Sequence, residues 1–253
     1  MEEYLEFAKR LVLEGGRIIF DNFEKAHQVE AKSDATPVTE VDRRINELIK
    51  DSIRQKYPEH GLLGEEENWG GGNEEFQWIC DPLDDTKGFI KGIRNSMCML
   101  GLSNGGKILL SAVYEPFNDE LYWAIKGGGS YCNGRAINVG KQSLQGGIVM
   151  LGEKSAEVFI KGIQDAHAQP EMLSGTGFKC MKLARGYGCG ILKIETDYHD
   201  IGPASLIIEE AGGLVTGLNG KALSFNQEIH GAILSNGVSH QELLEIANVT
   251  VNS

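Results

Sequence analysis

Three aspartates, Asp81, Asp84 and Asp85, stand together in residues 78–89, directly after a short apolar run. A buried strand that ends at this point would bring the three carboxylates out together. Like charges this close oppose each other's ionisation, and a hard divalent cation such as Mg²⁺ is the usual partner of such a cluster. The alternative interpretation is an acidic surface turn, because Asp-Pro and Asp-Asp are common in turns.

Two further acidic segments favour a metal site. Glu65 follows Leu62, Leu63 and a glycine shortly before Asp81, and Asp200 comes much later, ahead of an apolar run with helical spacing. In metal-assisted phosphoryl transfer, two cations about 4 Å apart bind the attacking and the leaving oxygen, and carboxylates supply the hard oxygen ligands. Three acidic segments at the ends of apolar stretches are the pattern that such a site requires.

At these residues the chain resembles the inositol monophosphatase family of Mg²⁺-dependent, lithium-sensitive phosphatases. The family's Gly-Glu-Glu, Asp-Pro-Ile/Leu-Asp-Gly-Thr, Trp-Asp-x-Ala-Ala-Gly and Glu-Ala-Gly-Gly motifs have as counterparts Gly64-Glu65-Glu66, Asp81-Pro82-Leu83-Asp84-Asp85-Thr86, His199-Asp200-Ile201-Gly202-Pro203-Ala204 and Glu210-Ala211-Gly212-Gly213. Residues 32–42 resemble a loop of the family and its Thr-x-x-Asp, and residues 127–134 resemble its glycine-rich hairpin. The resemblance covers nearly the whole chain.

The resemblance implies a mixed fold, α+β and α/β, with sugar-phosphatase-like layers α-β-α-β-α and an active site between two halves. Apolar spacing predicts helices over residues 4–19, 41–53, 156–168 and 178–186 and after Asp200. Strand-like runs occur at residues 76–80, 97–102, 108–114, 120–125, 148–151, 214–215 and 232–234. We expect an N-terminal α+β domain over residues 1–140 with the metal-binding motifs, and a C-terminal α/β domain over residues 141–253 that contributes the last ligand.

By their positions in the family's motifs, five residues would bind metal. Glu65, Asp81 and the backbone carbonyl of Leu83 would hold one Mg²⁺. Asp84 and Asp200 would hold a second together with Asp81, which would bridge the two ions. The resemblance implies two or three Mg²⁺ per site. Mg²⁺ usually keeps several water ligands, and one of these waters is the natural nucleophile.

Three residues would act on that water. In the family, the residues that match Glu65 and Thr86 orient and deprotonate it, and Asp42 would hydrogen-bond Thr86 and make it a better proton acceptor. The alternative role of Thr86 is a helix N-cap; the two roles are compatible, because such a helix would direct backbone N–H groups at the phosphate. Asp42 also stands three positions after Thr39, as in a variant of the capping box. Lys32 would approach a third, weaker metal ion or the phosphate, or is a solvated lysine.

The chain departs from the family pattern beside Thr86, where Asp85 replaces a glycine. Its carboxylate would lie next to the amides that receive the phosphate and would weaken turnover, unless it faces solvent or binds a further cation. His199 replaces the tryptophan of the last motif and is interpreted as an aromatic packing substitute, not as a catalyst. Pro203 is acceptable only in the first turn of a helix, so we expect that helix to start after Asp200.

Two lysines bear on the substrate. Seven residues before the last metal aspartate, inositol phosphatases have a glutamate that binds inositol hydroxyls, and this chain has Lys193. A cation there suits a second anionic group better than a neutral polyol. Lys179 and the run Thr86-Lys87-Gly88-Phe89 resemble the bisphosphate nucleotidase branch. The candidate substrates are an inositol phosphate, a bisphosphate nucleotide or a sugar phosphate, bound by Asp85, Thr86, Lys179 and Lys193.

The composition favours a soluble enzyme. The 253 residues carry 24 Lys+Arg against 36 Asp+Glu, and a net charge of −12 disfavours a nucleic-acid polymer or an anionic membrane as a partner. The acidic N-terminus lacks the apolar core of a signal peptide, and no apolar run approaches the ~18 residues of a membrane span. Five scattered cysteines favour reduced thiols. We expect a cytoplasmic enzyme, and the family resemblance implies a homodimer.

Two other classes of function compete with an active phosphatase. A catalytically weakened family member that binds phosphate esters or a partner without efficient turnover is consistent with Asp85. A purely structural acidic protein is disfavoured, because it gives no reason for three acidic motifs in the order of the family.

Overall fold

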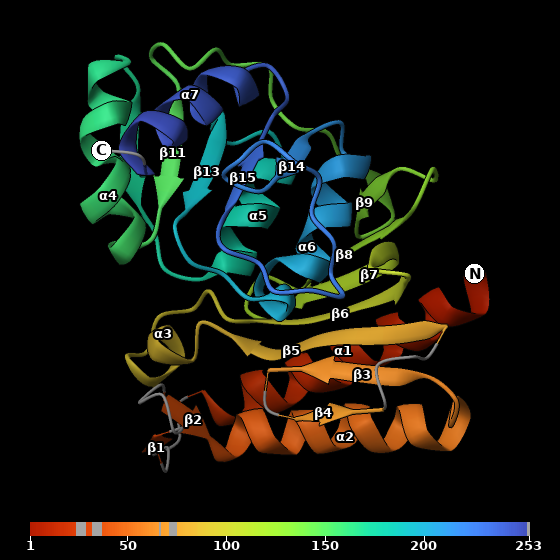
Figure 1. Cartoon of the computed structure of the whole chain (residues 1–253). Helices are drawn as coiled ribbons and strands as arrows, with labels where there is room; N and C mark the ends of the chain where they lie inside the picture. The colour runs from red at the N-terminus through yellow and green to blue at the C-terminus, as the bar shows by residue number, and fades with distance from the viewer. Residues whose placement is uncertain (24–28, 32–36, 66, 71–74, 252–253) are drawn as a thin grey trace.

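The computed structural model describes residues 1–23, 29–31, 37–65, 67–70 and 75–251, and most of their strands form two sheets (Figure 1). The larger sheet has the order β10 (Arg135–Ala136), β9 (Ser130–Cys132), β8 (Glu120–Ile125), β7 (Lys107–Glu115), β6 (Met97–Asn104), β5 (Phe76–Asp84), β3 (Gly61–Gly64) and β4 (Asn68–Trp69). The smaller sheet has the order β12 (Gln169–Met172), β11 (Ile148–Leu151), β13 (Gly190–Lys193), β15 (Ala232–Ser235) and β14 (Leu214–Thr216). Two short strands, β1 (Val29–Ala31) and β2 (Pro37–Thr39), pair separately.

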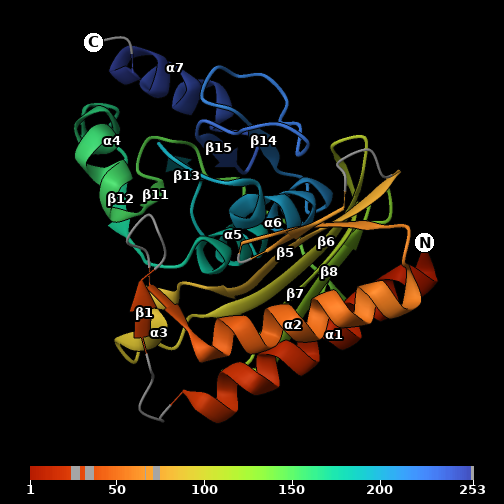
Figure 2. The same ribbon diagram turned by 60° about the horizontal axis from the view of Figure 1, so that its bottom comes forward.

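Helices and sheets alternate in five layers (Figure 2). Helices α1 (Glu2–Asn22) and α2 (Glu40–Lys56) cover one face of the larger sheet. Helices α5 (Thr176–Ala184) and α6 (Tyr198–Glu210) lie between the two sheets, and α4 (Glu153–Asp165) and α7 (His240–Val251) cover the outer face of the smaller one. A short helix, α3 (Thr86–Ile90), follows β5 directly. The expected order of layers, α-β-α-β-α, is confirmed.

The amphipathic helices form because their apolar residues recur on one face. In α1, most of the apolar positions predicted from spacing are buried against the larger sheet, among them Leu5, Leu11 and Ile19. A Cβ atom on Gly16 would lie 2.2 Å from the ring of Tyr114. Glycine at this position therefore lets the helix backbone approach the sheet closely.

Helix α6 differs from the sequence-based expectation in its start. It begins at Tyr198, not after Asp200, so Pro203 lies in its second turn and the prediction of a first-turn proline was wrong. A proline there lacks the N–H that would bond to the carbonyl of His199. Pro203 is buried, and a Cβ atom on Gly101 of β6 would lie 3.4 Å from its Cα. Pro203 therefore packs closely on the larger sheet at the turn of α6 that lacks this hydrogen bond.

The strands of the two sheets fall on either side of residues 137–147 in the sequence. Helix α6 contacts strands of both sheets, and one large core cluster contains residues from both. The division into domains at residues 140 and 141 stays a prediction. Within the residues that the structure describes, none of the helices has the length and apolar character needed to cross a membrane.

Candidate active site

The carboxylates of Asp81, Asp84 and Asp200 converge although the residues lie far apart in the sequence. Each offers an oxygen, and these oxygens lie within 4.8 Å of one another. Asp81 and Asp84 belong to β5, which extends past the predicted end at Cys80. In a regular strand, residues three apart point to opposite faces. The pairing of β5 with β6 is irregular between Asp81 and Asp84, and this irregularity accounts for both side chains reaching Asp200.

Burial and mutual repulsion make this cluster electrostatically unfavourable without a counter-charge. Asp81 is 2% exposed, and burial together with the charge of Glu65 raises its pKa well above the usual value. Burial and the neighbouring Asp85 raise the pKa of Asp84 to about 7. Asp200 is different: burial opposes its ionisation, but the ammonium of Lys193 overcomes this and lowers the pKa of Asp200 to about 2.

The N-terminus of α5 holds Asp84. Its two carboxylate oxygens accept hydrogen bonds from the backbone N–H groups of Thr176 (3.0 Å) and Gly177 (2.9 Å). These donors and the positive end of the helix dipole favour the ionised carboxylate. Sequence reasoning missed this contact, because it joins residues 92 and 93 positions apart. Glycine at 177 was the available signal, since a Cβ atom there would lie 3.1 Å from Asp84.

Thr86 and Asp42 form the expected hydrogen bond. The Thr86 hydroxyl lies 3.0 Å from Oδ1 of Asp42 and 3.1 Å from the carbonyl oxygen of Leu83. The other oxygen of Asp42 accepts from the backbone N and the hydroxyl of Thr39, which completes the capping box at the start of α2. Burial raises the pKa of Asp42. The predicted variant of the capping box is confirmed, and the hydrogen bonds of Asp42 connect the start of α2 to Thr86.

Asp85, not Thr86, is the N-cap of α3, which corrects the predicted capping role of Thr86. Its backbone adopts the left-handed conformation, with φ 63°. One carboxylate oxygen accepts from the N–H of Gly88 at 3.1 Å. Among the described residues the other oxygen is buried and has no hydrogen-bond partner. The side chain therefore folds back over the helix start and does not extend into solvent.

Both predicted substrate lysines line the same cleft. Nζ of Lys193 lies 3.0 Å from Oδ2 of Asp200 and 2.7 Å from the hydroxyl of Thr176, so Lys193 is not a solvated surface lysine. Lys179 is only 3% exposed and donates to the carbonyl of Leu173, and burial lowers its pKa. Lys32 lies outside the described residues.

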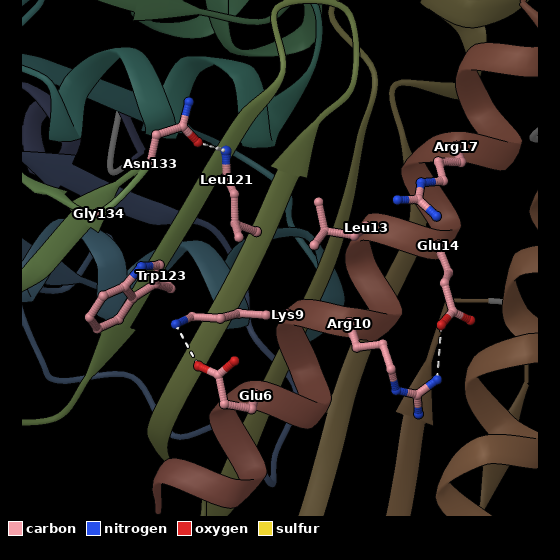
Figure 3. Close-up of a pocket in the computed structure, with 10 residues that line it drawn as sticks. All are labelled: Glu6, Lys9, Arg10, Leu13, Glu14, Arg17, Leu121, Trp123, Asn133 and Gly134. Atoms are coloured by element: carbon pink, nitrogen blue, oxygen red, sulfur yellow. Dashed lines mark hydrogen bonds and ion pairs between the residues drawn. The ribbon is translucent and has the colours of Figure 1, made fainter.

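A cleft of about 750 Å³ brings these groups together; its lining includes Glu65, Asp81, Asp85, Thr86, Lys179 and Asp200. A second pocket lies between α1 and β8 and contains none of these residues (Figure 3). Four of its charged side chains pair with each other, Lys9 with Glu6 and Arg10 with Glu14. The site residues predicted from the sequence therefore gather in the first cleft and not in the second pocket.

The donor set of the cleft suits a hard divalent cation. All the ligand atoms in the Asp81–Asp84–Asp200 cluster are carboxylate oxygens. Two of these carboxylates have raised pKa values because they are buried beside like charges, and a bound cation would relieve that repulsion. Mg²⁺ prefers such oxygen ligands, whereas Zn²⁺ sites commonly include His or Cys, which this cluster lacks.

The layered fold and the carboxylate cleft together define a metal-dependent phosphatase. The model of the inositol monophosphatase family matches residues 1–251. The chain belongs to this family and is a phosphoric monoester hydrolase.

Relatives and solved structures agree with this assignment. The fructose-1,6-bisphosphatase/inositol-1-monophosphatase of Aquifex aeolicus is 32% identical, over 98% of this chain and 96% of the relative. The IMPase of Thermotoga maritima superposes with a TM-score of 0.90 at 26% identity, covering 99% of this chain and 98% of that one. A dual-specific IMPase/NADP phosphatase, solved with D-inositol-1-phosphate, has a TM-score of 0.85 at 25% identity and covers 97% and 95%.

Proposed function

We propose that this chain hydrolyses a small phosphate monoester with Mg²⁺ and water. The observation that carries the proposal is the convergence of Asp81, Asp84 and Asp200 beside the hydrogen-bonded pair Thr86 and Asp42. Neither group alone specifies the reaction. Together they offer oxygen ligands for cations and a hydrogen-bonding hydroxyl that would orient a water in one cleft.

The proposed metal ligands are those that the family resemblance implies. Glu65, Asp81 and the carbonyl of Leu83 would hold one Mg²⁺, and Asp81, Asp84 and Asp200 a second. A third, weaker Mg²⁺ is proposed only as an ion that Lys32 would approach. When bound, Mg²⁺ would supply Lewis acidity to the phosphate and lower the pKa of bound water.

The chain's own residues would handle the proton. A water held between Glu65 and Thr86 would attack phosphorus as its proton passes to the Glu65 carboxylate, and the ester oxygen would leave with a proton from solvent. The Thr86 hydroxyl donates a hydrogen bond to Asp42, so the lone pairs of the Thr86 oxygen would face the water. Burial of Thr86 and Asp42 keeps competing solvent away from this pair.

Four lysines of the cleft favour a substrate with a second anionic group. They are Lys87, Lys154, Lys179 and Lys193. A bisphosphate, either of a sugar or of a nucleotide, therefore fits better than an uncharged polyol phosphate, and a sugar bisphosphate agrees with the name of the Aquifex aeolicus relative. Inositol phosphate is the comparison substrate.

Phosphate release tests the proposal. The purified chain is assayed with inositol 1-phosphate, fructose 1,6-bisphosphate, adenosine 3′,5′-bisphosphate and histidinol phosphate, in Mg²⁺ and in EDTA. We expect Mg²⁺-dependent release that is faster with the bisphosphates. A protein that folds, binds Mg²⁺ and releases no phosphate from any of the four would contradict it.

Asp85 favours a second candidate, a weakened enzyme that binds phosphate esters or a partner without efficient turnover. Its carboxylate already accepts from the N–H of Gly88, at the helix start beside the phosphate position that the family resemblance implies. Binding of the same four esters without release, measured by calorimetry, would favour this candidate.

The assembly is proposed from the family resemblance, and the location from the composition of the chain. We infer a homodimer in the cytoplasm, with residues 1–140 and 141–253 as its two domains in each protomer. Light scattering on the purified chain tests the dimer, and a single mass of 27.6 kDa at all concentrations would exclude it.

A further inference from the structure

Lys193 places a positive charge inside the carboxylate cluster. It is the last residue of β13, and its side chain is 13% exposed. Its ammonium lies 3.0 Å from Oδ2 of Asp200 and 2.7 Å from Oγ1 of Thr176. Since so little of the side chain is in contact with water, solvent screens this charge weakly.

The charge of Lys193 acts on both elements that supply the metal ligands. Thr176, which accepts from Lys193, donates its backbone N–H to Asp84 of β5. Asp200, which pairs with Lys193, belongs to α6. Lys193 therefore connects the carboxylates contributed by β5 and α6.

The hydrogen bonds to Asp200 all end on one oxygen. Lys193, the hydroxyl of Thr196 (3.1 Å) and the backbone N of Asp197 (3.4 Å) each donate to Oδ2. Among the described residues, these donors leave Oδ1 as the oxygen that a cation would use. A cation on Oδ1 and the ammonium on Oδ2 would then share the carboxylate of Asp200.

We propose that Lys193 is a positioning residue that fixes Asp200 and, through its charge, weakens the binding of the divalent cation that Asp200 would hold. This inference rests on the proposed function, in which Asp200 is a metal ligand.

Two opposing effects decide whether replacing Lys193 weakens or tightens metal binding. Loss of a residue that orients a metal ligand typically costs about 10- to 100-fold in metal affinity. Repulsion between a unit charge and a dication about 5 Å apart, at an effective dielectric constant of about 20, corresponds to more than about a thousandfold. The charge effect is the larger, so removal of the ammonium tightens binding.

Titration with Mn²⁺, in the absence of any substrate, tests the inference. Lys193→Met is expected to bind its weakest Mn²⁺ at least about tenfold more tightly than wild type, or to bind one more Mn²⁺ over the same concentration range. Lys193→Arg keeps the charge and is expected to stay near wild type. Lys154→Met is the matched control, because Lys154 lines the same cleft but pairs with the exposed Glu195. Equal or weaker Mn²⁺ binding by Lys193→Met would overturn the inference.

Melting in EDTA gives a readout that does not depend on the bound ion. Without the ammonium, Asp200 loses its ion pair, so Lys193→Met should melt at a lower temperature than wild type in EDTA and recover much of the difference with Mn²⁺. If Lys193→Met does not fold, Lys193→Gln takes its place with the same expectations.

Failure of this inference is separable from failure of the proposed function. Wild type that binds Mn²⁺ but hydrolyses nothing would remove the proposed function and leave the effect of Lys193 on metal affinity intact. Wild type that binds no Mn²⁺ would overturn both.

Discussion

At the residue scale, Asp85 combines a strained backbone with a repulsive charge. It adopts φ 63°, where glycine is favoured, and its carboxylate binds the N–H of Gly88. One of its oxygens is buried and has no hydrogen-bond partner among the described residues. An anionic substrate near α3 would meet this negative charge.

Replacing Asp85 with glycine is therefore expected to raise kcat/KM. A unit charge about 4 Å from the phosphate, at an effective dielectric constant of about 20, is worth about 4 kcal/mol before screening, so the gain should exceed about tenfold. Asp85→Asn is the matched variant, because asparagine tolerates the same backbone and lacks the charge. Unchanged or lower kcat/KM in both variants would show that Asp85 has acquired a role of its own.

At the element scale, His240 joins three elements of the C-terminal half. At the start of α7, its ring lies 2.8 Å from the hydroxyl of Ser235 in β15 and 3.0 Å from that of Thr216 in β14. Both hydroxyls also reach backbone carbonyls, Thr216 that of Gly217 and Ser235 that of Leu214. Burial of the ring favours its neutral form, in which one ring nitrogen donates a hydrogen bond and the other accepts one.

Protonation of His240 should loosen these three elements. Burial lowers its pKa from 6.5, so the unfolded chain binds the proton more readily than the folded one. The stabilisation is present above pH 6.5 and is lost as the pH falls through the lowered value. In Mg²⁺, which removes the opposing effect of the carboxylate cluster, we expect the free energy of unfolding to be smaller at pH 5.5 than at pH 7.5, and this difference to shrink in His240→Asn. His230→Gln, at an exposed histidine, should keep the wild-type pH dependence.

At the scale of the whole molecule, the carboxylate cluster opposes folding unless a cation is bound. The pKa of Asp84 rises from 3.8 to about 7 on folding, and that of Asp81 rises too. The folded chain therefore binds these protons more tightly than the unfolded one, and the stability they give is lost as the pH rises toward 7 and above.

Chelated protein should accordingly lose stability as the pH rises from 6 to 8, and Mg²⁺ should remove most of that loss. Differential scanning calorimetry in EDTA and in Mg²⁺ measures both curves. Parallel curves in the two conditions would mean that the cluster does not bind the ion.

Much of the site could be predicted because its residues stand in short local motifs. Asp81, Asp84 and Thr86 lie within six residues, and the capping box of Thr39 and Asp42 is a local pattern. The strands β5 to β8 and the helices α1 and α2 follow from apolar periodicity.

The parts that escaped prediction depend on contacts between distant residues. The bond from Thr176 to Asp84 spans 92 positions, and no local pattern specifies it. The start of α6 at Tyr198 is a local exception: Asp197 is the N-cap and forms a capping box with Asp200, a signal that the preference of Pro203 for a first turn concealed. The ion pair of Lys193 with Asp200 requires β13, a four-residue strand with no distinctive sequence pattern.

The most direct measurement of the central claim compares wild type with Asp81→Asn over one Mg²⁺ titration, recording the melting temperature and phosphate release together. Mg²⁺ at about 100 times its Kd adds about 2.7 kcal/mol, or about 5–10 °C for a chain of this size. We expect both signals to rise over the same Mg²⁺ range in wild type, and Asp81→Asn to fold but show little of either. Equal stabilisation by Mg²⁺ in both proteins, or full phosphate release by Asp81→Asn, would contradict a catalytic metal site at this cluster.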